Sequence, residues 1–117
     1  MTFDRQSEPR IDAITQRVVH AAKEVLGERL DKVILFGSYA RGDFDNESDV
    51  DLMILAHMCQ KEVSGSQRDI RKKLPGIDLA YDIAVCIHVT GTETFSLYQD
   101  VLPFYKNIVN EGVLLYG

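Results

Sequence analysis

Residues 35–55 read LFGSYARGDFDNESDVDLMIL, and this stretch decides the fold. Residues 32–36 (KVILF) form a nearly continuous apolar run that stops at Gly37, as is typical of a strand buried on both faces. Residues 50–55 (VDLMIL) predict a second strand. The stretch therefore predicts two strands joined by a turn and a polar loop.

Two carboxylates stand at the beginning of the second predicted strand. Because residues two apart in a strand point to the same face, Asp49 and Asp51 are expected to project side by side. Such a pair is repulsive unless something neutralises it, and a hard divalent cation with oxygen ligands is the usual solution. The pair therefore predicts a site for Mg²⁺.

The turn after the first strand provides the complementary chemistry. Gly37 leaves room for a ligand to approach the backbone, and the first N–H groups of a short helix over residues 38–41 attract phosphate. The Ser38 hydroxyl is a further donor. Phosphate donors beside metal-binding carboxylates are typical of a site for a metal-bound nucleoside triphosphate.

The charge distribution points to the same segment. The chain has 117 residues, which predicts a single domain over 1–117, and a net charge of -5 from eighteen acidic and thirteen basic residues. The whole excess lies between residues 43 and 51, which hold five acids and no base. An acidic protein does not grip nucleic acid through its own surface, so no direct nucleic-acid binding is expected.

The rest of the chain predicts helices around a small sheet. Residues 8–30 have the apolar spacing of an amphipathic helix, and residues 61–74 show a weaker version of that pattern. Residues 93–110 are predicted helical, with Pro103 at the start of a second helix and Gly112 at its end. The order of elements indicates an α/β or α+β domain with a small mixed β-sheet flanked by helices.

A third predicted strand carries another carboxylate. Residues 78–89 (DLAYDIAVCIHV) alternate in polarity, which predicts one long strand. Asp82 becomes a third metal ligand if this strand neighbours the one that carries Asp49 and Asp51; otherwise Asp82 is a buried, hydrogen-bonded carboxylate. Asp78, at the start of the strand, is the weaker substitute.

The motif resembles the signature of a known enzyme family. Gly37-Ser38, ten intervening residues, Asp49-x-Asp51 and a downstream aspartate on a strand are similar to the signature of the DNA polymerase beta-type nucleotidyltransferase superfamily. The phrases GSYARGD and SDVDL resemble its minimal nucleotidyltransferase (MNT) branch, which includes the antitoxins of HEPN/MNT pairs. The resemblance implies the polymerase beta-like catalytic fold.

The resemblance also implies a role for each motif residue. Asp49, Asp51 and Asp82 would be catalytic and bind two Mg²⁺ ions, with Asp82 on the ion that activates the acceptor hydroxyl. Gly37 and Ser38 would hold the triphosphate. The implied reaction is in-line attack of a hydroxyl on the α-phosphorus, with pyrophosphate as the leaving group.

Other polar residues near the motif have less specific roles. Arg41 would either contact phosphate or brace Asp49. Asp43, Asp45 and Glu47 are expected to form a solvated loop.

The acceptor is implied by the resemblance alone. Minimal members of the family are commonly paired with an all-helical HEPN protein, and the resemblance implies transfer of AMP from ATP to a tyrosine of that partner. The expectation is a cytoplasmic, ATP-binding antitoxin whose acceptor binds through a HEPN partner or a homodimer. Two alternatives remain open: an antitoxin with an idle site that neutralises its partner by binding, and a nucleotidyltransferase for a small-molecule acceptor.

The isolated cysteines and histidines suggest no further site. Cys59 and Cys86 lie far apart, so reduced thiols are expected, with Cys86 in the core and Cys59 exposed. His20, His57 and His88 are expected at the surface or in packing roles. No apolar run approaches the length that spans a bilayer, so no membrane segment is expected.

Overall fold

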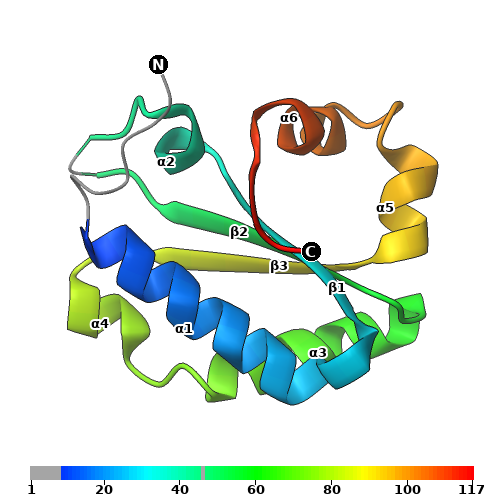
Figure 1. Ribbon diagram of the computed structural model, residues 1–117, viewed down its shortest axis with the longest axis horizontal. Helices are drawn as coiled ribbons and strands as arrows, with labels where there is room; N and C mark the ends of the chain where they lie inside the picture. The colour runs from blue at the N-terminus through cyan, green and yellow to red at the C-terminus, as the bar shows by residue number, and fades with distance from the viewer. Residues whose placement is uncertain (1–8, 46) are drawn as a thin grey trace.

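The computed structural model describes residues 9–45 and 47–117, which form a four-stranded sheet between two sets of helices (Figure 1). The strand order is β3-β2-β1-β4; β1 is antiparallel to β2 and β4, and β2 is parallel to β3. This is the mixed α/β architecture that the sequence predicts. In chain order the elements are α1 (Pro9–Leu26), the 3₁₀ helix η2 (Gly27–Arg29), β1 (Leu30–Phe36), α2 (Ser38–Arg41), β2 (Val50–Ala56), α3 (Gln60–Lys72), α4 (Ile77–Tyr81), β3 (Val85–Gly91), α5 (Thr92–Tyr98), α6 (Pro103–Glu111) and β4 (Val113–Tyr116).

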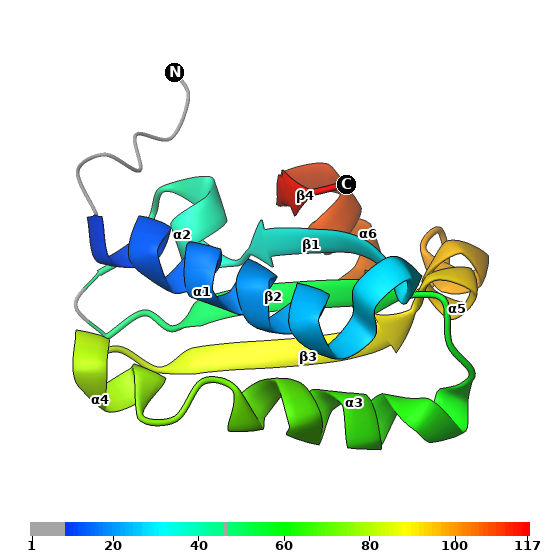
Figure 2. The same cartoon turned by 60° about the horizontal axis from the view of Figure 1, so that its bottom comes forward.

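One face of the sheet carries the larger core. Leu35, Leu52 and Ile87 come from three neighbouring strands and share a buried cluster with Ile14 of α1 and Ile70 of α3. Figure 2 shows α1 and α3 along the same side of the sheet. Burial of each such side chain contributes about 1.5–3 kcal/mol, so this layer holds the strands in place.

The opposite face carries a smaller core. Ile34 and Met53 pack with Phe95 of α5 and Ile108 of α6. Because side chains alternate along β2, Asp51 lies on the same face as Met53. The carboxylate therefore lies on the α5–α6 side of the sheet, next to this second cluster.

The strand predicted over residues 78–89 is wrong in its first half. Residues Ile77–Tyr81 form α4, and β3 begins only at Val85. Asp82 ends α4 in the left-handed conformation, with φ 54° and ψ 47°, which aspartate tolerates better than most residues. Polar alternation over a few residues fits a short helix as well as a strand, so the pattern could not distinguish them.

The other predicted elements are confirmed with small shifts of their ends. The helix predicted over residues 8–30 begins at Pro9, the first described residue, and α1 gives way to η2 after Leu26. Helix α6 begins at Pro103 and is closed by Gly112, whose N–H donates to the Ile108 carbonyl at 2.9 Å. The strand β4 was not predicted. Within the described residues, no helix combines the length and apolar character needed to cross a membrane.

Candidate functional site

The site is built around a close contact between the turn after β1 and the start of β2. Phe36 and Asp51 are register partners, so the turn at Gly37 lies beside the Asp51 carboxylate. A Cβ at Gly37 would lie 2.6 Å from Asp51 Oδ2. Gly37 has φ 80° and ψ -156°, a region that essentially only glycine occupies. Glycine therefore lets the turn and the carboxylate pack directly together.

The short helix α2 follows this turn, as predicted. The N–H groups of Ala40 and Arg41 donate to the Gly37 carbonyl, both at 3.1 Å, and Gly42 ends the helix in the left-handed region. The first N–H groups of a helix have no acceptor inside the helix. Together with the Ser38 hydroxyl, the first N–H groups of α2 form a set of hydrogen-bond donors suited to phosphate.

Asp49 is exposed just before β2 begins, whereas Asp51, the second residue of β2, is partly buried. Burial raises the pKa of Asp51, and the neighbouring Asp49 charge raises it further, while the charges of His88 and Arg41 oppose these effects. The ionised pair is thus held at an energetic cost that a bound cation would offset.

Arg41 lies close to this pair. Its Nε is 3.1 Å from Asp43 Oδ2 and 3.7 Å from Glu111 Oε2, and its Nη2 is 3.4 Å from Ser38 Oγ. The structure therefore pairs Arg41 with the polar loop and with the end of α6. The alternative in which Arg41 braces Asp49 would require an ion pair with Asp49 instead.

Strand β3 does not bring a third carboxylate to Asp49 and Asp51. The register partner of Asp51 on β3 is Cys86, whose Sγ lies 4.0 Å from Asp49 Oδ2. Asp82 is exposed at the end of α4, before β3 begins. Within residues 9–45 and 47–117, no group of three or more His, Cys, Asp or Glu side chains could hold a metal ion. The strand geometry that made Asp82 a candidate third ligand is therefore absent.

Two residues for which the sequence predicts no functional role, Cys86 as a core residue and His88 as a surface or packed one, lie close to the two aspartates. Cys86 is only partly buried, and burial raises the pKa of its thiol, with Asp51 and Asp49 raising it further, so the thiol stays protonated. His88 lies two residues further along the same face of β3. The alternation of polar and apolar residues along β3 places Cys86 and His88 on one face, but the register of β3 against β2 could not be read from the sequence. Cys59 is exposed, as predicted.

Comparison with known proteins identifies the family. Residues 20–117 match the family described as "Polymerase beta, Nucleotidyltransferase". The chain belongs to this nucleotidyltransferase family. It is similar to two proteins of Methanocaldococcus jannaschii, each named "Putative protein adenylyltransferase". One is 36% identical over 98 residues, which cover 84% of this chain and 90% of the relative. The other is 46% identical over 61 residues, 52% of this chain and only 60% of that relative.

Solved structures share the fold of this nucleotidyltransferase at low sequence identity. A structure described as a "putative nucleotidyltransferase" from Sulfolobus solfataricus has a TM-score of 0.65 at 20% identity and covers 95% of this chain and 84% of its own. A structure of a toxin-antitoxin with AMP-PNP has a TM-score of 0.54 at 22% identity, and the match covers 87% of this chain and 72% of that chain. A structure of a mutant of the toxin-antitoxin MntA-HpeT has a TM-score of 0.52 at 19% identity, and the match covers 87% of this chain and 71% of that chain. These likenesses confirm the predicted nucleotidyltransferase fold.

The donor set of this nucleotidyltransferase fits Mg²⁺ bound together with a triphosphate. Magnesium is usually held by one or two carboxylates and by phosphate oxygens of the substrate, because it gives up its water reluctantly. Asp49 and Asp51 supply two carboxylates, and the Gly37 turn lies in contact with one of them. The residues therefore fit a cation shared between protein and nucleotide.

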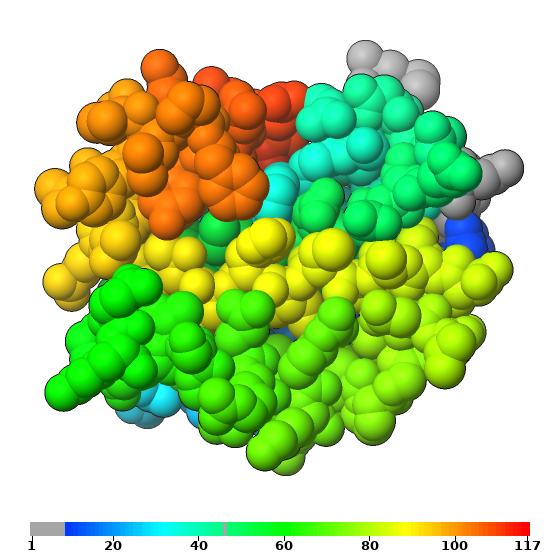
Figure 3. All heavy atoms as spheres, turned by 180° about the vertical axis from the view of Figure 1, so that it is seen from behind, coloured from blue at the N-terminus to red at the C-terminus, as the bar shows by residue number. Residues whose placement is uncertain are grey.

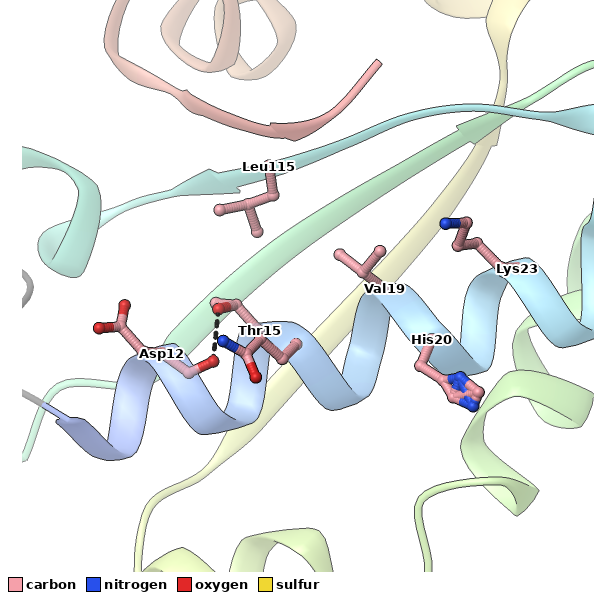
Figure 4. Close-up of a pocket in the computed structure, with 7 residues that line it drawn as sticks. Asp12, Thr15, Val19, His20, Lys23 and Leu115 are labelled. Atoms are coloured by element: carbon pink, nitrogen blue, oxygen red, sulfur yellow. Dashed lines mark hydrogen bonds between the residues drawn. The ribbon is translucent and has the colours of Figure 1, made fainter.

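A separate pocket lies on the other face of the sheet (Figure 4). Its volume is about 450 Å³, and its lining includes Asp12, Thr15, Val19 and His20 of α1 together with Leu115 of β4. The Thr15 hydroxyl donates to the Asp12 carbonyl at 3.0 Å, which leaves it engaged within the helix. This pocket is separated from the aspartates by the sheet.

Proposed function

We propose that this nucleotidyltransferase uses Mg²⁺ to transfer AMP from ATP to a tyrosine hydroxyl of a HEPN-type partner, as the cytoplasmic antitoxin of a toxin-antitoxin pair. Residues 1–117 would act as one minimal domain. The names of the two curated relatives support adenylyl transfer, and toxin-antitoxin proteins are among the structures that share the fold. The observation that carries the donor half is the contact between Gly37 and Asp51.

Each residue of the donor half has a specific task in this proposal. Asp49 and Asp51 would hold Mg²⁺, which when bound would neutralise charge on the phosphates. The backbone after Gly37 and the Ser38 hydroxyl would orient the β- and γ-phosphates. Arg41, whose guanidinium reaches Ser38 Oγ, would add positive charge on the same side.

The proposed reaction is a single displacement at the α-phosphorus. The acceptor oxygen forms a bond to the α-phosphorus while the bond from that phosphorus to the bridging oxygen breaks. Pyrophosphate leaves with the bonding electrons, and the hydroxyl proton passes to solvent. An exposed carboxylate at Asp49, a partly buried one at Asp51 and the Gly37 turn favour this chemistry because they would fix both the cation and the leaving group.

Label transfer tests the proposal directly. The purified protein is incubated with ATP labelled at the α-phosphate, Mg²⁺ and the helical protein encoded beside it. Label is expected on a tyrosine of that partner, and it should be lost in Asp49→Asn/Asp51→Asn. The matched control is Asp45→Asn/Glu47→Gln, which removes two exposed carboxylates from the neighbouring loop and should leave transfer in place. Absence of metal-dependent nucleotide binding in the unchanged protein contradicts the proposal.

One observation favours the alternative of an idle antitoxin that acts by binding. Cys86 stands opposite Asp51 on β3, so the described site has two carboxylates rather than three. Under this alternative, the Asp49→Asn/Asp51→Asn variant would still neutralise the partner in a growth assay. Loss of neutralisation together with loss of label supports the enzyme.

A further inference from the structure

The order of the strands separates the two sides of the reaction. The Gly37 turn follows β1, whereas β3 lies on the other side of β2. In-line displacement requires the attacking oxygen and the leaving pyrophosphate to lie on opposite sides of the α-phosphorus. If pyrophosphate leaves near Gly37, as the proposed function has it, the acceptor must approach over β3.

On this side, His88 extends from β3 toward the carboxylates. Its register partner on β2 is Met53, yet its ring centroid lies only 5.6 Å from that of Phe36 on β1. Two strands separated by a third lie about 10 Å apart, so the His88 and Phe36 rings meet over β2. Phe36 is the register partner of Asp51, which places the ring near Asp51. The electrostatic effect of His88 on Asp51 agrees with this position.

A pocket opens beside His88 at the outer edge of the sheet. Its volume is about 390 Å³, within the range of ligand pockets. Figure 3 shows this face, with β3 as a yellow band between α5–α6 in orange and α3 in green. The Phe104 ring centroid lies 5.8 Å from that of His88 and 5.5 Å from that of Phe36, so Phe104 connects the pocket to the register partner of Asp51. The lining includes Met53, Gln67, His88, Thr90, Leu102 and Phe104.

The lining matches a flat apolar ring that ends in a hydroxyl. Leu102 and Phe104 provide apolar walls near the mouth, and His88 provides a ring nitrogen near the carboxylate site. We propose that this pocket receives the tyrosine side chain of an acceptor protein, with the phenol ring against Phe104 and the hydroxyl at His88. The proposal rests on the proposed function, to which it adds the acceptor site. A serine or threonine side chain is too short to fill the pocket.

The surface around the mouth indicates that the tyrosine belongs to a protein. Leu97 and Val101 are 70% and 68% exposed, and Leu102 and Phe104 are 42% and 45% exposed. All four lie on the α5–α6 segment, and Leu102 and Phe104 also line the pocket. Exposed apolar residues gathered on one segment are typical of macromolecular contacts. A partner that inserts a tyrosine would cover them.

Binding of a minimal probe tests the pocket without requiring transfer. N-acetyl-L-tyrosinamide is titrated into ¹⁵N-labelled protein, with N-acetyl-L-serinamide as the comparison. Tyrosinamide is expected to shift the amide signals of Gln67, His88, Thr90 and Phe104, and serinamide to leave them in place. No shift at these positions up to the solubility limit of tyrosinamide overturns the proposal, as does an equal response to serinamide.

Matched substitutions on the same segment sharpen the result. Phe104→Ser should raise the dissociation constant for tyrosinamide about fivefold or more, because a central aromatic contact is lost. Val109→Ser is the control, since Val109 is a 53% exposed residue of the same helix outside the pocket. Leu102→Ser provides a second pocket variant if Phe104→Ser unfolds. Unchanged affinity in both pocket variants overturns the proposal.

A parallel titration with Mg²⁺ and ATP separates this proposal from the proposed function. Nucleotide is expected to shift Gly37, Ser38 and Asp51 in the unchanged protein and in Phe104→Ser alike. If nucleotide shifts the pocket residues and tyrosinamide does not, the pocket holds the nucleoside and only the acceptor proposal fails. If nucleotide shifts neither region, the proposed function itself fails.

Discussion

Replacement of Gly37 by alanine tests the geometry on which the donor half depends. The added Cβ would meet Asp51 Oδ2 at 2.6 Å, a separation that real Cβ atoms do not show. Either the carboxylate rotates away from the turn or the turn moves away from β2. Both responses separate the proposed phosphate donors from the carboxylate that is proposed to bind the metal.

The expected cost has two parts. The backbone at Gly37, with φ 80° and ψ -156°, lies in a region where a residue with a side chain is strained by about 1–3 kcal/mol. This strain should appear as a lower free energy of unfolding. Displacement of Asp51 should appear separately, as a loss of affinity for Mg²⁺ with ATP of about tenfold or more, since one charge-assisted ligand is misplaced.

Urea unfolding and calorimetric titration with ATP and Mg²⁺ measure the two effects. Gly76→Ala is the matched control, because Gly76 also has a positive φ of 68°, but a Cβ added there would meet no atom within 4 Å outside its immediate chain neighbours. That variant should lose about 1–2 kcal/mol of stability and keep its nucleotide affinity. A Gly37→Ala protein that binds nucleotide as tightly as the unchanged protein refutes the reasoning.

Three further substitutions address the charges of the site. Asp51→Asn should raise the urea midpoint of the metal-free protein at neutral pH, because the raised pKa of Asp51 means that folding disfavours its charged form. The gain in urea midpoint should shrink at acidic pH, where the carboxylate is protonated in both the folded and the unfolded state. A gain that does not change with pH contradicts this prediction. Arg41→Ala should leave the unfolding free energy almost unchanged, since its ion pairs are exposed, but should weaken ATP binding severalfold. Unchanged affinity excludes a phosphate contact. Cys86→Asp adds a carboxylate opposite Asp51, so it should lower the melting temperature of the metal-free protein. It should also enlarge the rise in melting temperature that Mg²⁺ produces. A rise equal to that of the unchanged protein shows that position 86 does not face the cation.

The parts of the fold that the sequence predicted correctly are local. Strands β1 and β2 are antiparallel neighbours joined through α2, so their turn residues and carboxylates are brought together by a short connection. Gly37, Ser38 and the Asp49–Asp51 pair could therefore be placed from spacing alone. Pro103 and Gly112 likewise marked the ends of α6 through their own backbone preferences.

The prediction that Asp82 lies on a strand beside Asp49 and Asp51 required both a strand at residue 82 and a register between distant segments. Strand β3 pairs with β2 in parallel, and a parallel connection carries no short turn that fixes the alignment. The alternation over residues 78–89 continued through α4, so the strand was predicted to begin too early. In the structure, Cys86 rather than Asp82 reaches the level of Asp51.

This division between local and distant pairing also explains why the motif describes only half of a reaction. The donor half lies within one short connection, whereas the proposed acceptor half combines β3 with the start of α6 and a side chain of α3. These three elements meet only when the sheet and both helical layers are formed. A donor motif can therefore be recognised in a sequence while the proposed acceptor site depends on tertiary packing, and the exposed apolar side chains of Leu102 and Phe104 are where the proposed partner would complete it.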